Sequence, residues 1–389
     1  YLIKDMLATG RPADAETVTH LDRCLSCLSC MTTCPSGVDY MHLVDHARAH
    51  VAKTYQRPLL DRLFRRLLAT VIPNPTIFRL ALAGAWVARP FARFLPAKLG
   101  GLLALAPATL QRPSALEHPQ TIPAEVTKRM RVALLPGCAQ TVLDDAINAA
   151  TVRLLTRLGV EVVVAKGVGC CGALEHHMGE VATSHARAAR NIAAWIAEID
   201  GAGLDRIVVT TSGCGTTVKD YGHMFRDDPA HARDAARVSA IARDVSEVIA
   251  ELDLDARLVP GPRPGVAYHS ACSMQHGQKI TTLPAELLAR AGFPVAPIPE
   301  SHVCCGSAGT YNILQPELAT RLRDRKVANI ETTGAEIVAA GNIGCMIQIG
   351  SGLSTPIVHT VELLDWATGG PVPEGLEAFA SRPPPRTDA

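Results

Sequence analysis

Four cysteines near the start of the chain have a spacing that suits an iron–sulfur cluster. They form the run Cys24-x2-Cys27-x2-Cys30-x3-Cys34, and Pro35 follows directly. In two-cluster ferredoxin modules, the last cysteine of such a run, the one before proline, ligates the other cluster. We therefore expect Cys24, Cys27 and Cys30 to bind one [4Fe-4S] cluster and Cys34 to bind a second. A zinc site and unligated structural thiols are the alternatives.

The other eight cysteines form one pattern that occurs twice. In each copy a single cysteine is followed, after 31 residues, by a Cys-Cys-Gly triplet and later by a fourth cysteine. The first copy consists of Cys138, Cys170, Cys171 and Cys214, and the second of Cys272, Cys304, Cys305 and Cys345. Such a repeat indicates that one cysteine-bearing domain occurs twice.

Strands and helices alternate around these cysteines. Apolar runs at 132–135, 160–165 and 206–210 precede the cysteines of the first copy, and runs at 266–269, 293–297 and 336–340 precede those of the second. This alternation indicates a parallel sheet with helices on both faces, in which ligands gather at the carboxyl ends of the strands. We expect an α/β fold with two tandem, doubly wound, Rossmann-like domains, in which the four thiols of each copy meet at one sheet edge.

The thiols of each copy are expected to hold a cluster. Adjacent cysteines are poorly placed for a mutual disulfide but suit two thiolates that bind different atoms of a cluster. Gly172 and Gly306 follow these pairs and are expected to let the backbone approach a bulky cofactor, because glycine has no Cβ. A thiol or substrate pocket that no longer holds a cluster, and a purely structural group of thiols, remain as alternatives.

Histidines near the cysteines have several possible roles. His176, His177 and His302 are candidates for a ligand, a proton relay or a hydrogen-bond donor to a ligand, or are partly exposed loop residues. His269 ends a strand in the second copy, where the first copy has roughly Pro136. This mismatch argues against a ligand role shared by both copies.

The chain is expected to divide into four parts. They are a helical ferredoxin-type fragment at 1–56, a proline-rich helical connector at 57–130, and the two cysteine-rich domains at 131–260 and 261–389. The first copy carries extra residues, mostly the polar stretch Tyr221–Arg237, which we expect to be a surface excursion.

The connector is both basic and apolar. Amphipathic helices are expected at Leu59–Ile72 and Ile77–Phe94, and no apolar stretch reaches the roughly 18–20 residues that cross a bilayer. A helix lying on anionic lipid gains about 1 kcal/mol per basic residue, so 59–98 is a candidate for peripheral membrane contact. Packing on the chain's own domains or on a partner subunit is the equally open alternative. The basic residues are Arg62, Arg65, Arg66, Arg79, Arg89, Arg93 and Lys98.

Composition limits the possible functions. The chain has 389 residues, 48% of them hydrophobic and 4% aromatic, and a formal charge of +1. These values fit two or three α/β domains with no general attraction to nucleic acid. No signal peptide precedes the folded part, so we expect a reducing cytosol, where clustered cysteines bind metals. No dinucleotide fingerprint or P-loop is present, so we expect no NAD, FAD or ATP site on this chain.

Together these residues resemble the iron–sulfur subunits of bacterial glycolate oxidase (glycolate dehydrogenase). The resemblance covers essentially the whole chain and is carried by 21–37, by 135–140 and by the repeated cysteine pattern. The two copies resemble the cysteine-rich (CCG) domains shared with heterodisulfide reductase, lactate-utilisation and anaerobic glycerol-3-phosphate dehydrogenase subunits. The resemblance implies flavin-containing partner subunits that oxidise glycolate to glyoxylate, and a membrane quinone that accepts the electrons.

The chain departs from the family pattern in two ways. The family's N-terminal module carries two compact cysteine runs and two [4Fe-4S] clusters, whereas only the second run is present here. We expect the first run to lie upstream of Tyr1 in a longer protein. Relatives with unusual clusters often have a fifth cysteine in each copy, where this chain has Thr211 and Asn342. One four-thiolate cluster per copy is therefore expected, and a larger or non-cubane cluster is disfavoured.

The expected function is an electron-transfer subunit without a substrate-oxidation site of its own, cytoplasmic and peripheral on the cytoplasmic face of the inner membrane. An equivalent subunit for lactate or glycerol-3-phosphate oxidation is the nearest alternative. A heterodisulfide or thiol reductase whose repeated sites act directly on a disulfide is another, and a scaffold that only binds partners is the third.

Overall fold

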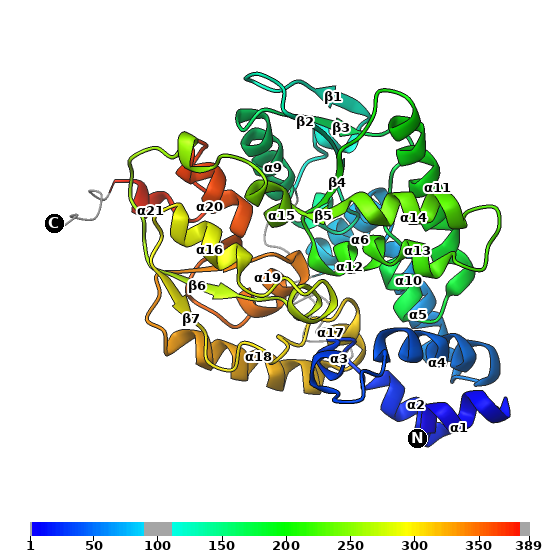
Figure 1. The fold of residues 1–389 in the computed structure, drawn as a ribbon. Coiled ribbons are helices and arrows are strands. Elements are labelled where there is room, and N and C mark those ends of the chain that lie inside the picture. Colours follow the sequence, from blue (N-terminus) through cyan, green and yellow to red (C-terminus); the bar gives the residue numbers. More distant parts are fainter. Residues whose placement is uncertain (1, 89–110, 382–389) are drawn as a thin grey trace.

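Two sheets, one for each copy of the cysteine pattern, form the centre of the molecule (Figure 1). The computed structural model describes residues 2–88 and 111–381. The first sheet has the strand order β1-β3-β2-β4-β5, and the second has the order β7-β6-β8-β9. The strands are β1 (Gln120–Ile122), β2 (Met130–Leu135), β3 (Val160–Val164), β4 (Arg206–Val209), β5 (Ala242–Asp244), β6 (Val266–His269), β7 (Val295–Pro297), β8 (Ile337–Ala340) and β9 (Ile357–His359).

The two sheets share one topology, which confirms the expected tandem α/β fold. Without β1, each sheet places its second strand at one edge, followed by its first, third and fourth strands, and all these pairs are parallel. Helices cover both faces of such sheets, so their strands are apolar along their whole length. Accordingly, Val132–Leu135 and Ile337–Ala340 are at most 1% exposed.

Helices connect the strands in the same order in both copies. The first copy contains α8 (Gln140–Leu143), α9 (Ala146–Arg157), α10 (Ala173–His177), α11 (Val181–Asp200), α12 (Ser212–Lys219), α13 (Tyr221–Met224), α14 (Ala232–Ile241) and α15 (Val245–Ala250). The second contains the π-helical turn η4 (Ser273–Gly277) and α16 (Leu283–Arg290), α17 (Tyr311–Leu314), α18 (Pro316–Glu331), α19 (Ile343–Gly350), α20 (Thr360–Ala367) and α21 (Glu377–Ala380). Two short 3-10 turns are η2 (Ala115–Glu117) and η3 (Asp255–Arg257).

The two copies share one hydrophobic core. Helices α9 and α15 of the first copy pack against α20 and α16 of the second, and buried side chains of both copies form a single cluster. At this interface the buried carboxylate of Asp365 accepts hydrogen bonds from Arg153 Nε at 2.8 Å and from Arg157 Nη1 at 3.0 Å. The two cysteine-bearing sheet edges are therefore held in a fixed relative position.

The N-terminal helices form a small unit that contacts both copies. This unit consists of α1 (Leu2–Thr9), α2 (Ala15–Asp22), α3 (Ser29–Thr33) and α4 (Tyr40–Thr54), around a core that includes Met6 and Val51. Thr32 Oγ1 lies 2.7 Å from His276 Nδ1 in the second copy, and His42 Nε2 lies 2.9 Å from Asp220 Oδ1 in the first. These contacts seat the compact cysteine run beside the repeat.

The connector folds into a helical hairpin of α5 (Leu59–Val71) and α6 (Pro75–Ala88). No single helix in the described residues is long and apolar enough to cross a membrane, although α5 and α6 together satisfy length and composition with a bend of 117° between them. The rest of the helix expected to end at Phe94 lies outside the described residues. The last part of the connector adds β1 to the first sheet, antiparallel to β3, which the sequence did not indicate.

The expectation of a surface excursion at Tyr221–Arg237 is wrong. This stretch forms α13 and α14, and it leads into strand β5 at the edge of the first sheet. Tyr221, Phe225 and Ala235 are at most 2% exposed and belong to the core of the first copy. The physical reason is that these few apolar residues fall on the inner faces of short helices, while the polar residues between them face outward.

Candidate metal centre

The four thiols of the second copy converge at the carboxyl edge of its sheet, as expected. Cys272 follows β6, the adjacent pair Cys304 and Cys305 follows β7, and Cys345 lies in the first turn of α19 after β8. The sulfur atoms of Cys272 and Cys304 are 3.8 Å apart, and all of these cysteines except Cys272 are buried. Parallel strands bring their carboxyl ends to the same edge, which is why residues so far apart in sequence meet here.

The first copy repeats this arrangement. Its thiols form a chain of neighbours, in which Cys170 is hydrogen-bonded to Cys138 and Cys171, and Cys171 is also hydrogen-bonded to Cys214. The hydrogen bonds from Cys138 and Cys171 hold the pKa of Cys170 well below its usual value, and they raise the pKa of the two donors. In the second copy, Cys304 has the same lowered pKa because Cys272 and Cys305 donate to it.

The glycine after each cysteine pair has a clear structural role. Gly172 has a φ of +83° and Gly306 a φ of +89°, a left-handed conformation that favours glycine. Their backbone N–H groups point at the sulfur atoms of Cys170 and Cys304, at 3.5 and 3.4 Å. A Cβ at Gly306 would lie 2.6 Å from the carbonyl oxygen of Ala319 in α18. Contact of these glycines with a cofactor stays a prediction.

The compact run lies beside the thiols of the second copy. Burial raises the pKa of Cys27, and the nearby thiols of Cys304, Cys24 and Cys30 raise it further. Burial also raises the pKa of Cys30, together with the thiols of Cys24 and Cys34. These mutual effects place the four cysteines of the run in one group. The same group lies within electrostatic range of Cys304, which the sequence had not indicated.

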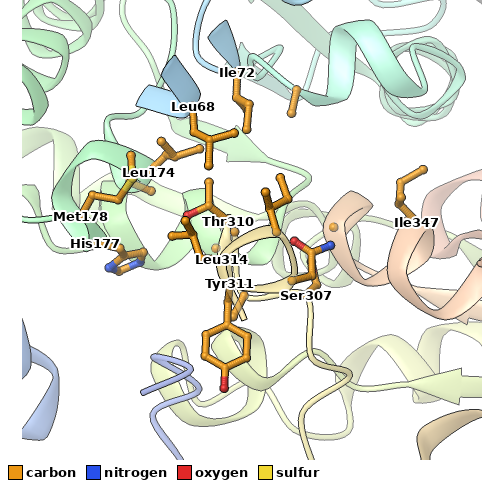
Figure 2. A pocket seen from close by; sticks show the side chains of 18 of the residues that line it. Leu68, Ile72, Leu174, His177, Met178, Ser307, Thr310, Tyr311, Leu314 and Ile347 are labelled. Carbon is orange, nitrogen blue, oxygen red and sulfur yellow. The ribbon is translucent and has the colours of Figure 1, made fainter. Parts of the chain in front are cut away.

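One cavity of about 670 Å³ joins the three groups of thiols. All eight cysteines of the repeat line it, together with Cys24 of the compact run. Figure 2 shows Leu68 of α5, Ile72 directly after this helix, Leu174 of α10, and Thr310 and Leu314 near α17 around this space. The helical hairpin thus supplies an apolar wall opposite the sulfur atoms.

Three of the four histidines considered from sequence belong to no group of candidate metal-binding donors among the described residues. His176 Nε2 lies 3.1 Å from Asp45 Oδ2 and His177 Nδ1 lies 3.6 Å from Asp45 Oδ1, so both histidines link α10 to α4 of the N-terminal unit. His177 also lines the cavity. His302 is exposed on the loop before Cys304.

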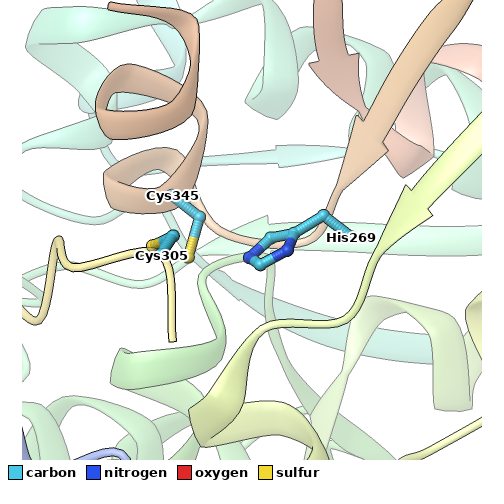
Figure 3. Close-up of side chains that lie close together, drawn as sticks. All are labelled: His269, Cys305 and Cys345. Carbon is cyan, nitrogen blue, oxygen red and sulfur yellow. The ribbon is translucent and has the colours of Figure 1, made fainter. Parts of the chain in front are cut away.

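His269 is different, because its ring faces the thiols of the second copy (Figure 3). One nitrogen of His269 and the sulfur atoms of Cys305 and Cys345 all lie within 4.8 Å of one another. The Cys305 thiol lowers the pKa of Cys345 to about 6, and His269 lowers it as well. In strand register the first copy has Leu135 at this position, not Pro136 as the sequence suggested. The two copies therefore do differ here, but the histidine lies at the site in one of them.

The residues at the expected fifth-cysteine positions make hydrogen bonds of their own. Thr211 Oγ1 donates to Gln140 Oε1 at 2.6 Å. Asn342 caps α19 by accepting from the N–H of Gly344 and Cys345, and its Nδ2 donates to Ser212 Oγ across the two copies. Both residues line the cavity beside the cysteines.

The donor atoms fit iron–sulfur clusters. The groups consist of closely spaced sulfur atoms, largely buried, with backbone N–H donors aimed at two of them. Thiolates are the ligands that iron–sulfur clusters prefer, and N–H groups near the sulfur atoms tune their potentials. Cys24, Cys27, Cys30 and Cys34, and the four cysteines of each copy, are the residues that would hold such clusters.

The fold and the groups of thiols define an iron–sulfur subunit of an oxidoreductase, built on cysteine-rich domains. The family described as "CCG: Cysteine-rich domain" matches residues 132–219 and 266–350. The chain is 39% identical over 367 residues to the glycolate oxidase iron-sulfur subunit of Escherichia coli (strain K12), covering 94% of this chain and 86% of that protein. The chain belongs to the family of glycolate oxidase iron–sulfur subunits.

Two further relatives are more distant. The "Probable glycolate oxidase iron-sulfur subunit" of Bacillus subtilis (strain 168) is 29% identical over 377 residues, covering 92% of this chain and 84% of that protein. Lactate utilization protein A of Bacillus licheniformis is 29% identical over 246 residues, covering 61% of this chain and 99% of that protein. The similarity to lactate-utilisation proteins is therefore confined to part of the chain.

Proposed function

We propose that this chain carries electrons from a flavin-containing glycolate dehydrogenase subunit to a quinone. The observation that carries the proposal is the placement of three groups of thiols around one cavity, with Cys27 of the compact run beside Cys304. The four sulfur atoms of each repeat copy suit a [4Fe-4S] cluster, and Cys24, Cys27 and Cys30 supply three ligands of another, while Cys34 serves a second cluster of the N-terminal module. Such clusters take up and release single electrons. Closely spaced centres of this kind form a path from a donor protein to an acceptor.

The chain's own residues shape this path. The N–H groups of Gly172 and Gly306 point at the sulfur atoms of Cys170 and Cys304 and stabilise them as thiolates. Arg48 donates to the carbonyl oxygen of Cys24 at 2.9 Å and so fixes the loop of the compact run against α4. The apolar wall of α5 limits the access of water to the thiols.

Glycolate is the proposed substrate of the partner subunit. The Escherichia coli relative, whose name identifies it as a glycolate oxidase subunit, matches the N-terminal unit and connector as well as the repeat. The lactate-utilisation relatives match only 61% of the chain. A flavin-containing partner is proposed because the described residues offer groups of thiols but the sequence has no dinucleotide fingerprint that would hold a flavin or NAD.

The path is tested by replacing one ligand in the complete complex. Cys27→Ser should strongly lower the rates of glycolate-dependent quinone and dye reduction. Replacing a residue that only hydrogen-bonds to a metal ligand lowers activity roughly 10–100-fold, and loss of a ligand itself should lower it further. Reduction of the flavin by glycolate should be unchanged, because the flavin receives its electrons before the path begins. Stopped-flow absorbance follows the flavin, and steady-state assays follow the acceptor.

Ser36→Ala is the matched control, since Ser36 is exposed in the same loop and carries no thiol. Normal quinone turnover in the Cys27→Ser complex would contradict the path. Reduction of a disulfide by the chain without its flavin partner would favour the thiol-reductase alternative instead.

The proposed acceptor side is the hairpin of α5 and α6, which we propose docks on the cytoplasmic face of the membrane. Eight of the twelve exposed large hydrophobic side chains among the described residues lie on these two helices. Leu67 is 54% exposed and also lines the cavity, so the apolar surface continues into the apolar wall. This continuity suits a lipid-soluble quinone that enters from the bilayer.

The basic residues of the connector contribute less to this surface than the sequence suggested. Arg65 binds Asp22 and Asp61, and Arg79 binds Glu117. Arg62 and Arg66 are exposed, whereas Arg89, Arg93 and Lys98 lie outside the described residues. We therefore propose that the hairpin docks on the membrane mainly through its apolar side chains, and that the exposed Arg62 and Arg66 contact the lipid head groups.

Membrane docking is tested with the double variant Leu60→Glu/Leu63→Glu in the complete complex. These leucines are 80% and 53% exposed, so charge there should not disturb the core. Each buried leucine contributes about 1.5–3 kcal/mol, so co-sedimentation with phosphatidylethanolamine/phosphatidylglycerol vesicles should fall at least about tenfold. Val259→Glu, at a residue 40% exposed in the segment that joins the two copies, is the control. Unchanged vesicle binding with loss of the flavin subunit would identify the hairpin as a subunit interface instead.

A further inference from the structure

We propose that His269 is a ligand of the metal centre in the second copy, so that the two copies hold chemically different centres. The first copy would bind its centre through sulfur alone, and the second through sulfur and one imidazole nitrogen. The inference deepens the proposed function, and it rests on that function only for the presence of iron in the second copy.

The environment of His269 points to a missing bond. The residue is 2% exposed, and within the described parts of the chain one ring nitrogen has no hydrogen-bond partner, while the other interacts with the Cys345 thiol. A buried polar group without a partner is unfavourable and rare in folded proteins. Its backbone cannot relax this arrangement, because His269 is the last residue of β6 and is paired with Ala340 of β8.

The ring is aimed at sulfur atoms that already form a candidate site. Figure 3 shows the imidazole extending from the end of β6 toward Cys305 and Cys345, and the three donor atoms lie within 4.8 Å of one another. Bonds from a metal to nitrogen and to sulfur are about 2.0–2.3 Å long. Donor atoms bound to one metal therefore lie slightly closer to one another than these three atoms do here. Small side-chain rotations would therefore bring all three donors within reach of one metal centre.

The first copy has no counterpart to this nitrogen among its described residues. Leu135 occupies the equivalent position of β2, and its side chain is part of the hydrophobic core. Tyr221 is a buried polar residue beside the thiols of the first copy, but its hydroxyl donates to the carbonyl oxygen of Cys171 and not to a sulfur atom. The difference between the copies is thus confined to the donor set.

The proposed ligand has a consequence for the direction of electron flow. The second copy has four thiols, as the first has, so His269 changes the charge of the centre by taking the place of one thiolate as ligand. Imidazole is neutral where a thiolate is negative, and replacing cysteine by histidine as a ligand raises the potential of iron–sulfur centres. The centre of the second copy should therefore be reduced before that of the first. No bond forms or breaks in this step, since the centre gains one electron from its donor.

The test is spectroscopic and uses the whole chain in its complex, prepared without oxygen and labelled with 15N-histidine. The complex is poised at potentials where only the first-reduced centre carries an unpaired electron, and pulsed EPR measures nitrogen coupling. We expect the strong coupling of a directly bound 15N in the unsubstituted protein and its loss in His269→Leu, which copies the first domain. His269→Cys should keep the centre and lower its midpoint potential.

His276→Gln is the matched control, because His276 is also buried in the second copy but binds Thr32. It should retain the nitrogen coupling. Absence of strong 15N coupling in the unsubstituted protein, or its persistence in His269→Leu, would overturn the proposal, as would zinc without iron in the second copy. If the nitrogen coupling is present but the complex does not reduce quinone, His269 is a ligand and the proposed function is wrong.

Discussion

At the scale of single residues, the Cys-Cys-Gly triplet has a physical explanation. The two cysteines present adjacent sulfur atoms with opposite pKa shifts, and the glycine turns its N–H back to the first of them. Only glycine suits Gly306, because the left-handed backbone and the close approach of α18 both exclude a side chain. The triplet is thus a local structure that prepares one thiolate, which explains why both copies keep it.

Gly306→Ala should destabilise the protein by about 3 kcal/mol, from the roughly 1–2 kcal/mol of a left-handed alanine and a similar cost of overpacking. The added Cβ lies 2.6 Å from the Ala319 carbonyl oxygen, so the loop must shift and the iron content of the second copy should fall. Urea unfolding and iron analysis measure the two effects.

Gly309→Ala separates the two causes. Gly309 has a φ of +68°, but no atom lies within 4 Å of a Cβ built there. It should cost only the conformational term of about 1–2 kcal/mol and leave the iron content unchanged. Equal losses of stability in Gly306→Ala and Gly309→Ala would show that contact with α18 is unimportant.

At the scale of secondary structure, the sequence predicts the central strands and the edge strands of the second sheet, but it misses the edge strands β1 and β5 of the first. Strands such as β2 and β8 are continuous apolar runs because helices cover both of their faces. The edge strands β1 and β5 have only three residues each, and their pairing depends on distant neighbours. No local pattern distinguishes β1 and β5 from loops.

The same reasoning explains which parts of the site could be predicted. The eight repeat cysteines each follow a strand of a parallel sheet, so their convergence follows from topology. The approach of Cys27 to Cys304 could not be foreseen, because it depends on how α3 packs against η4. The position of His269 was visible at a strand end, but the direction of its ring depends on loops that arrive from β7 and β8.

At the scale of the whole molecule, the two copies are packed together as one body. They share a hydrophobic core, and Asp365 binds two arginines across their interface. His359 adds a second buried link, since its Nε2–H donates to the carbonyl oxygen of Thr210 at 2.9 Å while its Nδ1 accepts from Val361 N. The alignment of the two groups of thiols therefore depends on a neutral histidine at this interface.

This link should make stability depend on pH. Burial lowers the pKa of His359 from 6.5 to about 4, so between these values the unfolded chain binds a proton that the folded chain does not. The free energy of unfolding should therefore fall as pH decreases from 6.5 to about 4, by on the order of 3 kcal/mol from this residue. His359→Gln, which keeps an amide donor and acceptor but does not titrate, should remove this part of the dependence. Urea unfolding of both proteins at pH 4.5–7.5 measures it, and parallel stability curves would exclude His359 as its source.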